Sequence, residues 1–164
     1  MNLQDIAYAA DAHSSYAKKP SKATRKWDGK TPYAVHPIWC ASTIATETML
    51  EERVRNEGIQ ALLYHDVIED TTRPIPEHLC ERVRQHILDM TFENSDVEME
   101  QIWSKPIEIK LYKLYDKVSN LLDGSWMSSE KRTRYENYTK KLCDEVESHY
   151  GELNITRIAR SIIK

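Results

Sequence analysis

Two pairs of ionisable residues interrupt an otherwise apolar segment of the chain, residues 62–70. His65 and Asp66 are adjacent, and Glu69 and Asp70 follow one helical turn later. Adjacent residues on a helix are about 100° apart around its axis, so His65 and Asp66 can both reach one point beside it. Burying this much charge is costly unless a cation, a partner or water compensates it. A divalent metal does so directly, whereas the alternative is a helix end with capping acids and a hydrogen-bonded core histidine.

Two more candidate ligands lie in distant segments. His36 stands at the start of a predicted helix, within Thr31–Pro37, and Asp116 stands in the middle of a strongly apolar one, within Lys113–Asn120. The plain alternative for Asp116 is a surface acid beside two lysines. Because leucine and valine residues flank it, a buried carboxylate is the better interpretation, and a metal explains such a carboxylate.

The elements that must position these residues are helices. The chain has only four glycines and six prolines, which predicts long helices joined by short connections. Apolar residues at helical spacing, with proline, serine and glycine at the ends, predict helices over residues 3–16, 37–55, 59–70, 77–90, 95–103, 106–123, 128–150 and 155–163. Residues 18–29 are typical of a loop. We therefore expect one all-α domain over residues 1–164, a compact helical bundle.

The composition of the 164-residue chain, 40% apolar and 30% charged, is that of a soluble globular protein. No apolar run is long enough to cross a bilayer, and the N-terminus lacks a secretory pattern, so we expect no membrane partner. Cys40, Cys80 and Cys143 are far apart and odd in number, which favours reduced thiols and a cytoplasmic location. The net charge of −3 argues against broad nucleic-acid binding.

One segment departs from this mildly acidic average. Residues 18–30 carry six lysines and arginines against a single acid, Asp28. Such a basic segment could bind a small anion such as a phosphorylated nucleotide. A solvated loop is the alternative interpretation.

The order His36, His65-Asp66, Asp116 resembles the H…HD…D signature of the HD phosphohydrolase superfamily. The surrounding motifs PYxxHP, HDxxEDT and KLxDKxxN are similar to the hydrolase domain of RelA/SpoT proteins, and more specifically to small alarmone hydrolases of the metazoan SpoT homologue type. The resemblance spans roughly residues 3 to 140. It implies an all-α HD fold and one divalent ion, usually Mn²⁺, held by these four residues. Fe²⁺, Co²⁺ or Zn²⁺ would also suit two histidines and two carboxylates.

The resemblance also implies roles for the residues around the metal. Glu69 and Asp70 match the acidic pair that the family uses in hydrolysis. The chemistry is reasonable, because a carboxylate near a metal can orient the attacking water or accept its proton. Acids at a helix C-terminus oppose the helix dipole, which argues against a purely structural role.

Further matches imply substrate-binding residues: Arg25 and Lys26 for phosphate oxygens, Asn120 near the sugar and phosphates, and Arg134 and Tyr138 at the nucleotide. A helical surface pair is the alternative for the last two. Trp27 is a candidate for stacking on a base, with packing on its own domain as the alternative.

Two segments depart from the family pattern. The segment between His13 and Arg25 is longer, and the segment between Thr91 and Asp116 is shorter and lacks a basic residue that the family uses. Because loops set specificity on such a scaffold, the match does not fix the nucleotide. Our leading hypothesis is hydrolysis of the 3′-diphosphate of guanosine tetra- or pentaphosphate with release of pyrophosphate. The alternatives are a phosphatase acting on a deoxynucleotide or a dinucleotide 2′-phosphate, and a non-catalytic nucleotide-sensing module.

Overall fold

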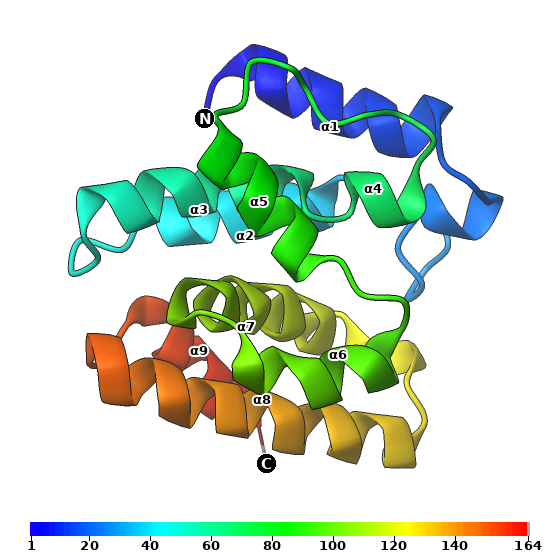
Figure 1. Cartoon of the computed structure of the whole chain (residues 1–164). Helices are drawn as coiled ribbons and strands as arrows, with labels where there is room; N and C mark the ends of the chain where they lie inside the picture. The colour runs from blue at the N-terminus through cyan, green and yellow to red at the C-terminus, as the bar shows by residue number, and fades with distance from the viewer. Residues whose placement is uncertain (164) are drawn as a thin grey trace.

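The computed structural model describes residues 1–163 (Figure 1). The helices are α1 Leu3–Ser15, α2 Val35–Ala45, α3 Glu52–Tyr64, α4 Val67–Asp70, α5 Glu81–Met90, α6 Ser95–Gln101, α7 Ile107–Leu122, α8 Ser129–Tyr150 and α9 Asn154–Ile162. Short 3₁₀ turns lie at Pro20–Lys22, Ile102–Ser104 and Gly124–Trp126. Within residues 1–163, extended pairing is limited to two isolated bridges, so the predicted all-α class is confirmed.

Helix α7 is the centre of the packing. It lies against α2, α3 and α5 on one side and against α8 and α9 on the other (Figure 1). Most of its side chains are buried, including Tyr112 and Tyr115, which are fully enclosed. One hydrophobic core runs from α1 to α9. Any charged group on the inner faces of α7, such as Asp116, is therefore removed from water.

The predicted helix over residues 37–55 is wrong in its second half, because α2 ends at Ala45 and α3 begins at Glu52. Tertiary contacts explain the interruption. Leu50 inserts into the core, and the buried Glu47 carboxylate accepts hydrogen bonds from the backbone N–H groups at the start of α9, with Ile155 N at 3.0 Å. Both contacts come from the non-helical segment between the two helices, residues 46–51.

The predicted helix over residues 59–70 is also divided, between Tyr64 and Val67. At the division, the ring of His65 hydrogen-bonds the Leu62 carbonyl through Nδ1 at 2.7 Å. The predicted helix over residues 77–90 starts later, at Glu81, because the Arg84 guanidinium holds the Pro76 and Leu79 carbonyls in the preceding loop. Both differences come from side chains that bond to backbone carbonyls.

Gly58 allows α3 to approach its neighbours closely. A Cβ atom at this position would lie 2.5 Å from Ile44 Cδ1 of α2 and 2.6 Å from Tyr112 Cε1 of α7. Glycine normally weakens a helix interior, so its presence here is explained by packing.

The connection between α1 and α2 is attached to the rest of the fold. Ala17 pairs with Thr71 just after α4, and Thr24 pairs with Pro32 across the turn at Gly29, whose φ is 64°.

A membrane-spanning helix needs both length and an apolar composition, and none of the helices in residues 1–163 combines the two.

Candidate metal centre and active-site cleft

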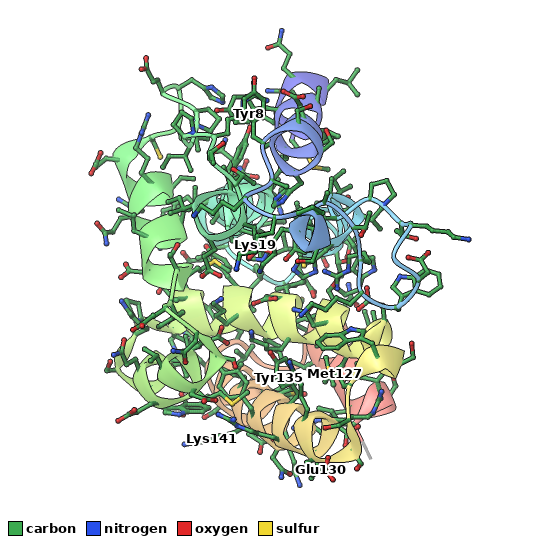
Figure 2. The ribbon with its side chains drawn as sticks, turned by 90° about the vertical axis from the view of Figure 1, so that its right-hand side faces the viewer. Tyr8, Lys19, Met127, Glu130, Tyr135 and Lys141 are labelled. Atoms are coloured by element: carbon green, nitrogen blue, oxygen red, sulfur yellow. The ribbon has the colours of Figure 1, made fainter. Side chains whose placement is uncertain are left out.

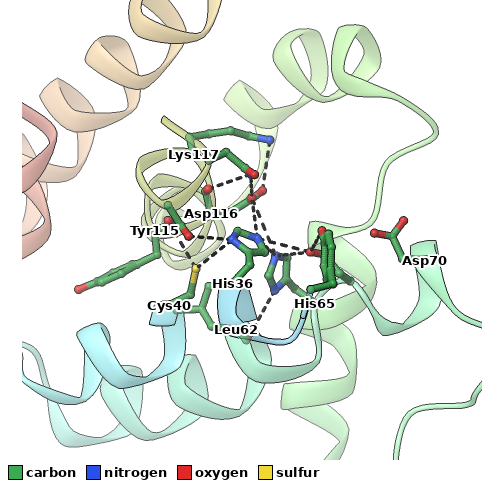
Figure 3. Close-up of polar contacts among 12 residues, drawn as sticks. His36, Cys40, Leu62, His65, Asp70, Tyr115, Asp116 and Lys117 are labelled. Atoms are coloured by element: carbon green, nitrogen blue, oxygen red, sulfur yellow. Dashed lines mark hydrogen bonds and ion pairs between the residues drawn. The ribbon is translucent and has the colours of Figure 1, made fainter. Parts of the chain in front are cut away.

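Four side chains from three separate segments converge at one buried point (Figure 3). The Nε2 atoms of His36 and His65 are 3.3 Å apart. Asp66 Oδ2 lies 3.4 Å from the first and 3.1 Å from the second. Asp116 Oδ1 lies 3.4 Å from His36 Nε2 and 4.0 Å from His65 Nε2. The residues that the sequence singled out as metal ligands are therefore neighbours in the structure.

Neighbouring contacts orient both imidazoles toward this point. His65 Nδ1 donates to the Leu62 carbonyl, which leaves the lone pair of Nε2 facing the cluster. His36 Nδ1 lies 2.8 Å from the hydroxyl of Ser119. When that nitrogen carries its proton and donates to Ser119, Nε2 of His36 also presents a lone pair. Such outer contacts are typical of metal-binding histidines.

The two carboxylates are held in the same way. The Tyr33 hydroxyl donates to Asp66 Oδ2 at 2.6 Å. Lys113 Nζ and Lys117 Nζ each lie 3.2 Å from Asp116 Oδ2. Burial opposes ionisation of Asp116, but the two lysines outweigh it and hold its pKa well below the usual value. Asp116 thus presents an anionic oxygen to the cluster at neutral pH.

The cluster fits a divalent cation. Two imidazole nitrogens face each other at 3.3 Å, and when each ring carries its proton on Nδ1, both Nε2 atoms direct lone pairs at one space beside the carboxylate oxygens, which are acceptors too. Ligands bound at about 2.1 Å lie about 3.0–3.4 Å apart around a tetrahedral or octahedral ion, which matches most of these separations. His36, His65 and Asp116 could hold a metal ion, and their candidate ligand atoms all lie within 4.8 Å of one another.

A cleft of about 250 Å³ opens beside the cluster. Asp66 and Asp116 line it together with Glu69 and Asp70, the predicted catalytic pair. Glu69 Oε1 accepts a hydrogen bond from the Phe92 backbone N–H at 2.9 Å. Burial, with the nearby charge of Asp66, raises the pKa of Glu69 and of Asp70 above the usual values. A carboxylate with a raised pKa is a better proton acceptor at neutral pH than an exposed one.

Comparisons with known proteins identify relatives of this chain. The chain is 31% identical to guanosine-3′,5′-bis(diphosphate) 3′-pyrophosphohydrolase MESH1 of Xenopus tropicalis over a gapped alignment of 129 positions, which covers 73% of this chain and 70% of the relative. The chain belongs to the MESH1 family. The Homo sapiens MESH1 protein gives the same identity over an alignment of the same length. The Drosophila melanogaster protein is 26% identical over a gapped alignment of 170 positions, which covers 93% of this chain and 88% of that one.

A solved structure supports the fold. It is described as a metazoan ortholog of SpoT that hydrolyzes ppGpp, and it matches with a TM-score of 0.70 and 23% identity over 98% of this chain and 92% of that one. A search against protein-family models gives no match. The family resemblance inferred from the three motifs is confirmed, and the all-helical fold of this MESH1-family chain is that of the solved SpoT ortholog.

Two of the predicted substrate-binding residues of this MESH1-family chain, Arg25 and Asn120, are hydrogen-bonded to each other. The buried Arg25 guanidinium donates from Nε and Nη2 to the two carboxylate oxygens of Asp123, at 2.6 and 2.9 Å, and from Nη2 to Asn120 Oδ1 at 2.9 Å. Asn120 also donates to Asp116 Oδ1 at 2.6 Å. This chain of contacts connects Arg25 to the metal cluster. Asp123, which the sequence interpretation did not include, neutralises the arginine.

The predicted Lys26 faces an aromatic residue that sequence reasoning missed. Its Nζ lies 4.5 Å from the ring centre of Trp126, and Lys131 Nζ lies 4.6 Å from the same ring. These three residues line a pocket that Asn120 and Tyr135 also line. Trp27 lies elsewhere, half exposed, in an adjacent pocket with Trp39. The position of Trp126 just after the predicted helix end at residue 123, close in sequence to Asn120, is the signal that could have suggested it.

The structure does not bring the other predicted pair to the cleft. Arg134 is exposed and forms an ion pair with Asp96, while Tyr138 is buried and donates to Glu98 Oε1 at 3.0 Å. Tyr135, on the same helix, lines the cleft. Glu98 was also missed, since it lies within an acidic run. Its carboxylate is buried and pairs with Lys117 at 2.8 Å and with Lys113 at 3.2 Å.

Proposed function

We propose that this chain is a metal-dependent guanosine-3′,5′-bis(diphosphate) 3′-pyrophosphohydrolase. The observation that carries the proposal is the cluster of His36, His65, Asp66 and Asp116 beside a cleft lined by Glu69 and Asp70. The family supports the substrate, because the MESH1 relatives bear this activity in their names. A sensing module would not need a pair of acids in addition to four metal ligands.

The proposed metal ligands are His36, His65, Asp66 and Asp116, and the proposed ion is Mn²⁺. Two imidazoles and two carboxylates suit Mn²⁺, Fe²⁺, Co²⁺ and Zn²⁺, and Mn²⁺ is preferred on the family resemblance. When bound, such an ion supplies Lewis acidity at the attacked phosphoryl group and makes water a better nucleophile at neutral pH.

Glu69 is the proposed base and Asp70 its partner in placing the water. The Phe92 N–H fixes the Glu69 carboxylate, so that the other oxygen is available for a proton. In the reaction, the water oxygen bonds to the phosphorus attached to the 3′ oxygen, and the bond between that phosphorus and the 3′ oxygen breaks. Glu69 takes a proton from the water, the leaving 3′ oxygen takes up a proton from solvent water, and pyrophosphate is released.

We assign nucleotide binding to the side of the cleft that holds Arg25, Lys26 and Asn120. Lys26 and the Trp126 face suit a phosphate and a base, respectively, because an indole ring stacks on aromatic bases. Arg25 and Asn120 order this side through their contacts with Asp123 and Asp116. Arg134 and Tyr138 remain proposed nucleotide-binding residues. Arg134 would have to break its ion pair with Asp96 to contact a nucleotide. Tyr138 would act indirectly, through its hydrogen bond to Glu98, which lines the cleft.

We also propose that residues 1–164 form a single HD domain in the cytoplasm. One hydrophobic core extends from α1 to α9, and Lys164 lies outside the described residues. The unpaired thiols of Cys40, Cys80 and Cys143 suit a reducing compartment.

A substrate panel tests the proposed function. The protein is loaded with Mn²⁺ and incubated with guanosine-3′,5′-bis(diphosphate), deoxynucleotides and a dinucleotide 2′-phosphate, and pyrophosphate and orthophosphate are measured separately. We expect pyrophosphate release from the first substrate. Orthophosphate from another substrate would support the nucleotide phosphatase instead, and binding without any turnover would support the sensing module.

A further inference from the structure

The cleft beside the metal cluster is rich in acids although its proposed substrate is a polyanion. Its lining includes six carboxylates, from Asp66, Glu69, Asp70, Glu93, Glu98 and Asp116. A bound divalent ion offsets only part of this charge. Phosphate groups entering the cleft therefore require a cation from the protein.

Three lysines are among the described residues that line the cleft: Lys22, Lys113 and Lys117. Lys113 and Lys117 are buried, and each is already shared between Glu98 and Asp116. Lys22 differs from them. Its side chain is 41% exposed and forms one ion pair, with Asp70 Oδ1 at 2.5 Å.

The position of Lys22 joins several parts of the site. It lines the cleft, the pocket that contains Lys26 and Trp126, and a depression beside Glu69 and Asp70. Figure 2 looks onto this side of the molecule, with Lys19 above Tyr135. A phosphate chain that extends from the metal cluster toward Trp126 would pass this ammonium group.

The segment that carries Lys22 is held firmly. The Lys18 backbone N–H donates to the Asp70 carbonyl at 2.8 Å, and its Nζ donates to the carbonyls of Ile68 and Glu69 at 2.7 and 3.0 Å. The Thr72 N–H donates to the Tyr16 carbonyl at 2.8 Å. These bonds attach the segment to the backbone of residues 68–72, next to Glu69 and Asp70, so the backbone that carries Lys22 is fixed relative to the proposed catalytic acids.

We infer that Lys22 is a substrate-binding residue that contacts the phosphate groups of the substrate and so contributes to specificity for a polyphosphorylated nucleotide. The inference rests on the proposed function. Lys22 lies in the segment between His13 and Arg25, which is longer here than in the family pattern. It would supply the positive charge that the shortened segment between Thr91 and Asp116 lacks. On binding, the Lys22 ammonium moves from the Asp70 carboxylate to a phosphate oxygen, which frees Asp70 to contact water.

The direct test uses inorganic pyrophosphate as the probe. Its affinity for the Mn²⁺-loaded protein is measured by calorimetry for wild type, Lys22→Met, Lys22→Arg and the control Lys30→Met. Lys30 is exposed, belongs to the same basic segment and lines none of the three pockets that Lys22 lines. Loss of one charge-assisted contact should weaken binding by about 10- to 100-fold in Lys22→Met. Lys22→Arg should recover most of the affinity, and Lys30→Met should change it less than about twofold. Lys22→Gln serves as a second neutral variant.

A second arm separates direct contact from an effect through Asp70. In an Asp70→Asn background, removal of Lys22 should still weaken pyrophosphate binding and raise KM. Equal affinities with and without Lys22 in that background would show that the lysine acts only through Asp70, and would overturn the inference. So would unchanged affinity in both neutral variants. Because the probe is not a nucleotide, a wild-type protein that binds pyrophosphate but does not cleave guanosine-3′,5′-bis(diphosphate) would contradict the proposed function alone.

Discussion

The Tyr33 hydroxyl donates a 2.6 Å hydrogen bond to Oδ2 of Asp66, across 33 residues of sequence. This oxygen is the atom that faces both histidines of the cluster. The bond therefore fixes the Asp66 carboxylate in the orientation that faces the proposed metal site. It connects the PYxxHP motif to the HD doublet physically, which explains why the two motifs belong to one site.

Tyr33→Phe should weaken metal binding without unfolding the protein. Outer contacts of this kind change metal affinity by about 10- to 100-fold, so we expect a loss in that range in a competition titration with a chelating dye. Asp66→Ala removes a proposed ligand and should bind no measurable metal, so it gives the lower limit of metal affinity in this titration. Tyr8→Phe is the matched control, because its hydroxyl bonds an exposed carbonyl, of Pro74, away from the cluster. Equal metal affinities for Tyr33→Phe and Tyr8→Phe would remove the role assigned to this bond.

Glu69→Gln should still bind the metal but should lower the rate of hydrolysis. The amide oxygen can still accept from the Phe92 N–H, but the side chain can no longer take a proton. We expect kcat to fall by about 10²- to 10⁴-fold with metal content unchanged, measured by metal analysis and pyrophosphate release. Glu93→Gln, an exposed acid that lines the same cleft, should retain activity within a few fold. Full activity in Glu69→Gln would show that another group is the base.

The sequence was sufficient to predict that His36, His65, Asp66 and Asp116 lie together, because each of them has a local signal. A histidine at a helix start, an HD doublet after an apolar run and an acid within an apolar helix all indicate buried charge. The helix limits around these residues were less predictable. The divisions before α3 and after Tyr64 depend on Glu47 and His65 bonding to backbone groups, and the partners of Glu47 lie about a hundred residues away.

The substrate side of the cleft shows the same limit more clearly. Arg25 matches a phosphate-binding arginine in sequence, but its partner Asp123 is 98 residues away, and no local pattern connects the two. Tyr138 occupies the expected helix position, yet α6 brings Glu98 to it and buries both. Which charged groups remain available to a ligand is thus decided by tertiary ion pairs.

His13 should make the protein less stable in acid. Its ring is buried, and neither nitrogen has a hydrogen-bond partner. Burial lowers the pKa of His13 from 6.5 to about 4. Asp66 favours the charged form of the ring, whereas the positive charges of His65, His36 and Lys22 oppose it. The unfolded chain therefore binds a proton between these pH values while the folded protein does not. Stability is fully present above pH 6.5 and is lost as the pH falls toward 4, by about 2–3 kcal/mol.

The measurement compares wild type with His13→Phe by urea unfolding of chelator-treated protein at pH 7, 6, 5 and 4. The other acid-sensitive groups are common to both proteins, so the difference between the two curves isolates His13. We expect the wild type to lose more stability than His13→Phe between pH 6.5 and 4. Parallel curves would mean that His13 is protonated in the folded state or does not titrate in this range.

Glu47 should be among the most important polar residues for stability. Its buried carboxylate accepts hydrogen bonds from the Tyr115 hydroxyl at 2.9 Å and from the backbone N–H groups of Asn154 and Ile155 at 3.1 and 3.0 Å. Glu47→Ala leaves these donors unsatisfied in the interior, which should lower the free energy of unfolding by about 3 kcal/mol. Glu47→Gln keeps one acceptor and should cost less, whereas the exposed Glu51→Ala should stay within about 0.5 kcal/mol. Urea unfolding measures all three, and a Glu47→Ala protein as stable as Glu51→Ala would show that water satisfies the start of α9 instead.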